Sequence, residues 1–494
     1  MPLSPEELER RLRAAVEAAA AAAALLRAEF HRPGGPRGAG SHAEVDAEAE
    51  ALILRILERT CPGETCLGEE LGARAQNDRP AGGAVWVIDP NDGTSPFLKG
   101  FRGSAVSIGL VEEGLPVLGV VHAWDGPTPE GDAFAWRRGG ALTRNGRETR
   151  RDWPQNVAPG QLALVSHEAD RKNAPANAAA VAPLRYLALP SIAWRMALVA
   201  AGEGDVAVSL GGPVSWDLAG GHALLLGAGG VLLDRRGQPL RYASDGTCEA
   251  GGGVFGGAPA LARELAGRDW SAVERRAAPE EGLDLCFPAP RAPRPPREVL
   301  ERARGCLLGL LAGDMVDGQL GEAAETALHL ARVLVRDGGY NPEVLRDVYQ
   351  SRPGTLHAGM DDDALLRAVP LAIFGALKDG EEQDAQVKAW ATQDAALTHP
   401  ACAAAAAALA GGLAAAIREG SEPEKGLADT NAAIAGALLG AVHGEGALPA
   451  RRRLELLSCR PIAGLEGVRR PRPRACWPVD ALVLAERLLV AWES

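Results

Sequence analysis

The sequence has 494 residues, of which 47% are hydrophobic and 23% charged, proportions of a folded globular protein that exclude a wholly disordered or collagen-like chain. At about 150 residues per domain, this length predicts about three domains or two large ones. The 64 acidic residues exceed the 52 Lys and Arg, giving a formal net charge of −12. Such a charge argues against a general nucleic-acid-binding protein, because phosphate backbones bind basic surfaces.

Two helices are predicted at the start of the chain. Ser4 and Glu7 have the spacing of a capping box and Pro5 suits the first helical position, which predicts a helix over 5–30. Glutamates precede its alanine-rich run, which argues against a signal peptide. A second helix is predicted over 46–59, where the apolar residues share one face.

Short apolar runs typical of β-strands follow. Strands are predicted at 85–88, 104–111, 115–122, 133–137 and 205–209, and helices at 190–202 and 217–226. Strands mixed with helices predict a layered α/β sandwich.

A proline- and arginine-rich segment at 287–297 has the composition of a stiff, extended linker. We therefore expect a first domain at 1–286, this linker, and a second domain at 298–494 in which alanine- and leucine-rich helical spacing predicts an all-α fold. The apolar run at 401–417 consists mostly of alanine and glycine, which favours a buried helix over a membrane span.

The eight cysteines include no C-x-x-C pair and no cluster with histidine at zinc spacing. This usage favours a reducing, cytoplasmic setting. We expect neither nucleic acid nor a membrane as a partner.

Three acidic clusters in the first domain suggest chemistry: Gly68-Glu69-Glu70, the run Asp89-Pro90-Asn91-Asp92-Gly93-Thr94, and Trp216-Asp217-Leu218-Ala219-Gly220. Taken singly, they fit a solvated pair, a turn and a helix N-cap. Taken together they suggest a metal site. Asp89 ends an apolar strand and Asp92 follows three residues later, so both carboxylates can face one cavity. Converging carboxylates repel unless hard cations lie between them, and Mg²⁺ prefers such oxygen ligands.

These clusters, with the Val-Ser-Ile-Gly-Leu strand at 106–110, resemble the inositol monophosphatase superfamily, which includes fructose bisphosphatases and bisphosphate nucleotidases. The resemblance covers roughly residues 5 to 285. It implies that superfamily's sandwich fold and a Mg²⁺-dependent, lithium-sensitive phosphomonoesterase. The substrate would be a small phosphorylated metabolite, such as a nucleotide, sugar or inositol phosphate.

The resemblance also implies the metal ligands, two or three ions in all. One Mg²⁺ would be bound by Glu69, Asp89 and the Asn91 carbonyl. A second would be bound by Asp92 and Asp217 and shared with Asp89.

Catalytic roles follow from the same motifs. Thr94, supported by Asp46, resembles the pair that orients the nucleophilic water, and Glu70 resembles a ligand or orienter of a third, loosely held ion. Gly93 lets the backbone approach a ligand, and free N–H groups at the helix start beside Thr94 suit a phosphate.

The predicted substrate pocket departs from inositol-preferring members. Leu210 stands seven residues before Asp217, where those members have a glutamate that contacts the inositol ring, and Pro190-Ser191-Ile192 replaces a Gly-Thr-Ala stretch. Ser191 is a candidate substrate contact. Arg195, one turn on, either meets a second anionic group or is an exposed helix arginine. We expect a phosphorylated nucleotide to be preferred over inositol 1-phosphate, because unpaired buried hydroxyls are costly beside apolar side chains.

Four motifs in the second domain resemble the ADP-ribosylglycohydrolase family, an all-α fold with two Mg²⁺. They are the runs at 305–314, 398–400, 429–440 and 477–482, within a resemblance that extends from about 302 to 492.

The ligand motifs of that family are incomplete here. Its Thr-Asp-Asp motif aligns with Gly321-Glu322-Ala323, and its Asp-x-Asp-Thr motif with Leu427-Ala428-Asp429-Thr430. We therefore expect a degenerate domain. The Asp361-Asp362-Asp363 run is a possible substitute ligand set, although a solvated loop is favoured. The alternatives are a bifunctional enzyme and a non-catalytic module that binds ADP-ribose or forms a homodimer.

Overall fold

The computed structural model describes residues 2–74, 83–275, 295–350, 362–378, 380–421 and 431–492. The chain divides into two compact units, Met1–Glu280 and Glu281–Ser494. The predicted linker lies outside the described residues except for 295–297, and Arg297 already begins a helix of the second unit.

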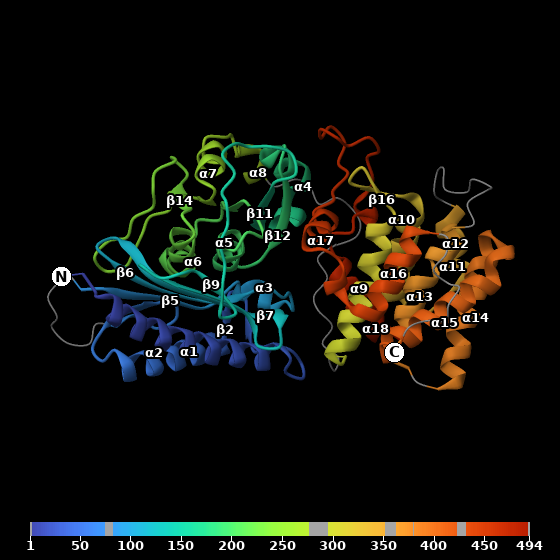
Figure 1. Ribbon diagram of the computed structural model, residues 1–494, viewed down its shortest axis with the longest axis horizontal. Helices are drawn as coiled ribbons and strands as arrows, with labels where there is room; N and C mark the ends of the chain where they lie inside the picture. Colours follow the sequence, from blue (N-terminus) through green and yellow to red (C-terminus); the bar gives the residue numbers. More distant parts are fainter. Residues whose placement is uncertain are drawn as a thin grey trace. The chain divides into compact units, whose positions relative to one another are not determined.

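An eight-stranded sheet forms the first layer of strands in the first unit, in the order β10-β9-β8-β7-β6-β5-β3-β4 (Figure 1). Neighbouring strands are antiparallel except β3 and β5, which are parallel. The strands are β3 (Thr65–Gly68), β4 (Gly72–Arg74), β5 (Val85–Asp92), β6 (Ala105–Glu112), β7 (Leu115–Thr128), β8 (Gly131–Arg137), β9 (Thr143–Arg144) and β10 (Arg147–Glu148). A separate hairpin joins β1 (Gly38–Ala39) and β2 (His42–Ala43).

A five-stranded sheet forms the second layer, in the order β12-β11-β13-β15-β14. Its members are β11 (Leu162–Ser166), β12 (Arg185–Leu189), β13 (Val206–Ser209), β14 (Val231–Asp234) and β15 (Val254–Gly257). The first three strands are parallel, and β15 runs antiparallel to both of its neighbours.

Helices cover both sheets and separate them (Figure 1). Helices α1 (Pro5–Phe30) and α2 (Glu44–Thr60) pack on the outer face of the larger sheet, and α5 (Ile192–Ala200) and α6 (Ser215–Gly227) lie between the sheets. Helices α4 (Glu168–Val181), α7 (Pro259–Ala266) and α8 (Ser271–Glu274) lie on the far side of the smaller sheet. The layers alternate between helix and strand, which confirms the predicted sandwich.

Local signals located the long N-terminal helices and the central strands. Ser4 Oγ accepts the Glu7 N–H and Glu7 returns a bond to the Ser4 N–H, so the predicted capping box begins α1. Strand β5 continues past the predicted residue 88 to Asp92, and α2 begins two residues early, at Glu44. The strands of the first unit that were not predicted are β1, β2, β3, β4, β11, β12, β14 and β15.

Small residues bring α6 close to the larger sheet. A Cβ added to Gly109 on β6 would lie 2.6 Å from Ala219 Cβ, and one added to Gly119 on β7 would lie 2.4 Å from the Gly220 carbonyl oxygen. Larger side chains would push the helix away from the sheet. This contact explains the small residues Ala219 and Gly220, because they let the first turns of α6 pack closely on β6 and β7.

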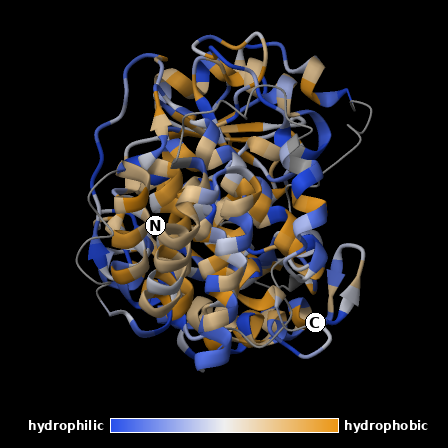
Figure 2. Ribbon diagram, turned by 90° about the vertical axis from the view of Figure 1, so that its right-hand side faces the viewer, coloured by the Kyte–Doolittle hydropathy of each residue, from blue (hydrophilic) through white to orange (hydrophobic). Residues whose placement is uncertain are grey.

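The second unit is helical, and Figure 2 shows hydrophobic residues on most of its helices. They are α9 (Arg297–Gly313), α10 (Glu322–Asp337), α11 (Pro342–Gln350), α12 (Asp362–Leu366), α13 (Ala368–Gly375), α14 (Glu381–Thr398), α15 (Ala403–Glu419), α16 (Ala432–His443), α17 (Ala450–Leu457) and α18 (Ala481–Ala491). A two-stranded hairpin, β16 (Met315–Val316) with β17 (Gln319–Leu320), is a small exception to the predicted all-α fold.

Glycines let α9 and α16 pack against each other closely. A Cβ on Gly309 would lie 2.0 Å from the Gly436 carbonyl oxygen, and one on Gly305 would lie 2.5 Å from that of Gly440. The glycine-rich motifs at 305–314 and 429–440 therefore have a packing role.

The predicted buried helix at 401–417 is found as α15. With the turn before it, this segment, Pro400–Glu419, is long and apolar enough to cross a membrane by length and composition. Core helices share that pattern, and Leu409, Leu413 and Ile417 are buried within the helical unit, where α15 packs on α13 and α14.

Candidate active site

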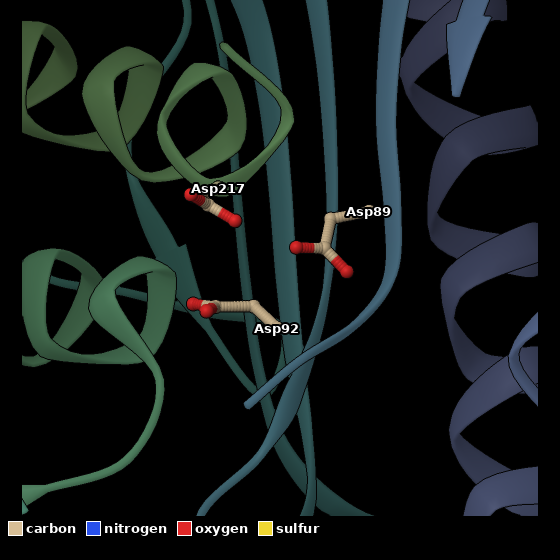
Figure 3. A group of neighbouring side chains, drawn as sticks. All are labelled: Asp89, Asp92 and Asp217. Carbon is tan, nitrogen blue, oxygen red and sulfur yellow. The ribbon is translucent and has the colours of Figure 1, made fainter. Parts of the chain in front are cut away.

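Three aspartates from two elements face one another. Asp89 and Asp92 lie at the end of β5, and Asp217 lies in the first turn of α6 (Figure 3). One carboxylate oxygen from each lies within 4.8 Å of the others. Asp89 is 1% exposed and Asp92 is 8% exposed, so water cannot fully solvate their charges. Such a set can bind a hard divalent cation.

Parallel pairing brings Glu69 to the same edge of the sheet. Strands β3 and β5 run side by side in register, so the turn after β3 meets the end of β5. The Glu69 N–H donates to the Ile88 carbonyl at 3.2 Å, which ties this turn to the strand before Asp89. Glu70 follows in the same turn and is half-buried.

Burial and mutual repulsion raise the pKa values of these carboxyl groups. Burial raises the pKa of Glu69 to about 8 and that of Asp92 to about 7, with Asp217 adding to both shifts. The pKa of Asp89 rises well above its usual value because it is buried beside Glu69, Asp92 and Asp217. Burial also raises the pKa of Asp217. The site is therefore short of positive charge, as expected of a cation site.

Asp46 on α2 holds the end of β5 and the start of α3. Its carboxylate accepts bonds from Asn91 Nδ2 and Thr94 Oγ1, both at 2.9 Å. Thr94 Oγ1 also lies 3.0 Å from the Asn91 carbonyl oxygen. Asp46 is fully buried, which raises its pKa to about 6. The predicted pair of Thr94 and Asp46 is in direct contact.

Gly93 turns the chain between Asp92 and the short helix α3 (Thr94–Leu98). Its φ of 105° is strained for other residues, and an added Cβ would lie 3.2 Å from Ser104 Cβ. Gly93 therefore lets the backbone N–H groups at the start of α3 approach the acidic cluster.

Ser191 is placed differently from its predicted role as a substrate contact. Its side chain is 0% exposed, and Ser191 Oγ donates to Asp92 Oδ2 at 2.5 Å. The Ala193 N–H donates to the same oxygen at 2.7 Å. Ser191 thus orients the Asp92 carboxylate, and its own oxygen accepts the Trp194 N–H as the N-cap of α5.

Arg195 is not the exposed helix arginine that one alternative predicted. It is 2% exposed, with Nε bonded to the Ser191 carbonyl and a terminal nitrogen bonded to the Val208 carbonyl. Burial lowers its pKa to about 10. These contacts link α5 to β13 and give no support to a bond with a second substrate anion.

The two apolar residues predicted to line the substrate pocket, Ile192 and Leu210, differ in how far they are buried. Ile192 is 4% exposed and packs in the interior, whereas Leu210 is half-buried immediately after β13. Of the two apolar replacements, Leu210 is the one that can meet a substrate.

Glu50 contributes to the site and was missed in the sequence. It is fully buried on α2, one turn after Asp46, and accepts the N–H groups of Glu70 at 2.8 Å and Leu71 at 3.1 Å. A Cβ on Gly68 would lie 2.0 Å from Glu50 Oε1, so a larger residue here would displace the Glu50 carboxylate. The spacing of four residues between Asp46 and Glu50 was the available signal, since both lie on one helix face.

Comparison with known proteins identifies the family of this site. The inositol monophosphatase family model matches residues 7–272, more than half of the chain. The chain belongs to the inositol monophosphatase family. Nus factor SuhB of Xylella fastidiosa is 34% identical over 39% of this chain and 69% of its own length. Inositol-1-monophosphatase of Synechocystis is 38% identical over 24% of this chain, a match that spans 42% of that protein.

A solved inositol monophosphatase structure from Anabaena is 26% identical to this chain. The match covers 52% of this chain and 94% of the Anabaena chain, with a TM-score of 0.42. In the second unit, the ADP-ribosylglycohydrolase model matches residues 424–474. As a member of this family, the chain is a phosphoric monoester hydrolase that depends on Mg²⁺ and acts on a small phosphorylated substrate.

Proposed function

We propose that the acidic cluster is the Mg²⁺ site of this phosphatase, with the ligands that the family motifs imply. Glu69, Asp89 and the Asn91 carbonyl would bind one ion, and Asp92 and Asp217 would share a second with Asp89. Glu70 would serve a third. The observation that supports the proposal is the group of Asp89, Asp92 and Asp217, whose carboxylate oxygens lie within 4.8 Å of one another. Bound Mg²⁺ offsets negative charge on the attacking and leaving oxygens of the phosphoryl group.

Thr94 and Asp46 are suited to receive the proton of the attacking water. Thr94 Oγ1 has one proton, which it can give to Asp46 Oδ2 at 2.9 Å. Its lone pairs can then accept a bond from water. With a pKa of about 6, Asp46 is mostly ionised at neutral pH and close enough to it to act as a base.

The start of α3 is suited to the substrate phosphate. Gly93 and Thr94 offer backbone N–H groups there, and the adjacent acidic cluster requires that cations accompany the anion. The phosphate would therefore lie between these N–H groups and the metal site.

Metal removal tests this assignment on the full chain. Phosphate release should stop after chelation and return when Mg²⁺ is added, and lithium should inhibit it. Activity that persists in chelator, on protein shown to be metal-free, would contradict the assignment.

We further propose a phosphorylated nucleotide, for example a 3′-phosphorylated adenosine phosphate or a phosphorylated ADP-ribose, as the preferred substrate. Leu210 favours an apolar face over a ring of hydroxyls. Phe101 and His167 form a tilted ring pair with centroids 5.9 Å apart, a surface suited to a planar base. His167 Nε2 lies 3.0 Å from Glu168 Oε1, and the positive charges of Lys99, Arg171 and Arg195 also act on His167, so this pair lies among charges of both signs.

The test compares kcat/KM for nucleotides, fructose 1,6-bisphosphate and inositol 1-phosphate on one preparation. A tenfold preference for inositol 1-phosphate, about 1.4 kcal/mol, would refute the substrate proposal and leave the metal assignment intact. Phe101→Leu adds a control, because it should lower kcat/KM about three- to tenfold for a nucleotide and not for inositol 1-phosphate.

We propose that the helical unit has lost glycohydrolase chemistry. Gly321 and Ala323 stand where ligands are needed, and Asp429 and Thr430 lie outside the described residues. The full chain should release no ADP-ribose from modified substrates in Mg²⁺. Turnover that disappears in Asp429→Ala would establish the bifunctional alternative instead.

Two further proposals rest on the family resemblance and composition alone. We propose that the chain forms a homodimer, which light scattering of the purified protein tests. We also propose a cytoplasmic location, which fractionation of the source cells tests.

A further inference from the structure

A second acidic cluster lies at the start of α10 in the helical unit. Glu322 is the first residue of this helix, and Glu325 follows one turn later at 4% exposure. Two arginines from the segment between α17 and α18, Arg470 and Arg472, contact both glutamates.

The contacts form a closed set of ion pairs. Arg470 places one terminal nitrogen 2.6 Å from Glu322 Oε1 and the other 3.1 Å from Glu325 Oε1. Arg472 places Nε 3.0 Å from Glu325 Oε1 and Nη2 3.3 Å from Glu322 Oε1. Two negative charges are therefore matched by two positive charges within hydrogen-bonding distance.

A third carboxylate at this end of α10 is also engaged. Asp314 Oδ2 accepts the Ala324 N–H at 2.9 Å. A Cβ added to Gly321 would lie 2.4 Å from the same oxygen. The Asp314 carboxylate therefore fills the space that a longer side chain at position 321 would need.

This donor set does not fit the divalent ions that the glycohydrolase resemblance implies. Gly321 and Ala323 offer no side-chain oxygen, and Glu322 and Glu325 already face guanidinium groups. A divalent cation placed there would meet two positive charges at short range and would have to displace them.

We infer that Arg470 and Arg472 replace metal ions at the start of α10, so that the helical unit folds without a divalent cation there. Guanidinium groups satisfy carboxylates through several donors and remain charged at every physiological pH. The inference is independent of the phosphatase function, because it concerns residues of the second unit only.

Metal binding by the full chain tests this directly. Asp89→Asn with Asp92→Asn removes ligands of the phosphatase site, and Mn²⁺ binding to this variant can then be followed by electron paramagnetic resonance. We expect no stoichiometric Mn²⁺ binding. One bound equivalent that is lost when Glu322→Gln and Glu325→Gln are added would overturn the inference.

Thermal unfolding provides a second test with a matched control. Arg470→Met with Arg472→Met strands a buried carboxylate and should lower the Tm of the helical unit by roughly 5–10 °C. Arg469 is adjacent in sequence but 80% exposed in its pair with Asp317, so Arg469→Met should change the Tm by about 1 °C or less. Equal Tm values for the double variant and the wild type would overturn the inference. If the double variant does not fold, the Mn²⁺ measurement decides.

Discussion

The starts of α6 and α10 both bring carboxylates together, but their surroundings differ. Asp217 on α6 faces Asp89 and Asp92. Burial raises the pKa values of all three groups, and neighbouring negative charges add to the shifts of Asp89 and Asp92. Glu322 and Glu325 on α10 instead face two arginines within 3.3 Å. In the helical unit, arginines of the chain supply the positive counter-charge. In the first unit, cations from solution must supply it.

This difference separates a metal site from a structural ion-pair cluster. Buried carboxylates that repel one another store unfavourable energy that a bound cation relieves. Carboxylates already paired with arginine gain little from a cation, because binding must first break those pairs. Acidic residues in a motif therefore predict metal binding only when no cationic side chain of the same chain occupies the site.

The largest expected effect is that of Asp92→Asn. This change removes ligand charge with almost no change in shape, so the fold should persist while kcat falls about 1,000-fold or more. Circular dichroism and steady-state phosphate release check both parts. Asp245→Asn, in an exposed loop of the same unit, serves as the control and should leave kcat unchanged. If Asp92→Asn kept full activity, the aspartates near α6 could no longer be distinguished as a metal site from the ion pairs at α10.

Glu50→Gln should have the next largest effect. Glu50 accepts two N–H groups from the turn that bears Glu69 and Glu70, and an amide would turn a donor toward one of them. Residues that orient metal ligands typically contribute 10- to 100-fold in metal affinity, so we expect about that increase in the Mg²⁺ concentration for half-maximal activity. At saturating Mg²⁺, kcat should largely recover.

Glu48→Gln is the matched control for Glu50. Glu48 lies on the same helix but is exposed and pairs with Arg37, so its substitution should leave the Mg²⁺ dependence unchanged. If Glu50→Gln lowers stability but not the apparent Mg²⁺ affinity, Glu50 has a structural role only.

The sequence predicts α1, α2, α5, α6 and the central strands of the first unit because their signals are local. The capping box at Ser4 and the glycine turns between strands identify themselves without knowledge of distant residues. Short strands such as β3 and β14 have four residues each, too few for a clear alternation, and their identity depends on pairing with strands remote in sequence.

The candidate site shows the same limit. The proposed metal ligands occur in compact motifs, so their chemistry could be predicted, whereas the partners of Ser191 and Arg195 could not. Ser191 lies 99 positions from Asp92, to which it donates a bond, and Arg195 is buried by packing between α5 and β13. The pairing of Arg470 with Glu322, 148 positions away, could not be predicted from the sequence either.

A moderate effect is expected from pH on the metal-free protein. Burial raises the pKa values of Asp46, Asp92 and Glu69 to about 6, 7 and 8, above the value of about 4 expected in the unfolded chain. The folded state therefore binds more protons than the unfolded state between these values, so the free energy of unfolding should fall as pH rises from about 5 to 8. In chelator, we expect a Tm lower by roughly 5 °C at pH 8 than at pH 5.

Mg²⁺ should reverse this trend, because it binds the deprotonated carboxylates and stabilises the folded state. Scanning calorimetry at both pH values, with and without Mg²⁺, makes the comparison. A Tm in chelator that is the same or higher at pH 8 would contradict the raised pKa values of the cluster.

The smallest expected effect is that of Ser191→Ala. The change removes one bond to Asp92 Oδ2, but the Ala193 N–H still donates to that oxygen at 2.7 Å, so kcat/KM should fall only about three- to tenfold. Asn431→Ala, which removes the N-cap of α16 in the helical unit, is the matched control: it should lower stability by a similar amount and leave kcat/KM unchanged. A loss beyond about a hundredfold in Ser191→Ala would exceed one orienting hydrogen bond and would restore Ser191 as a direct contact of the substrate.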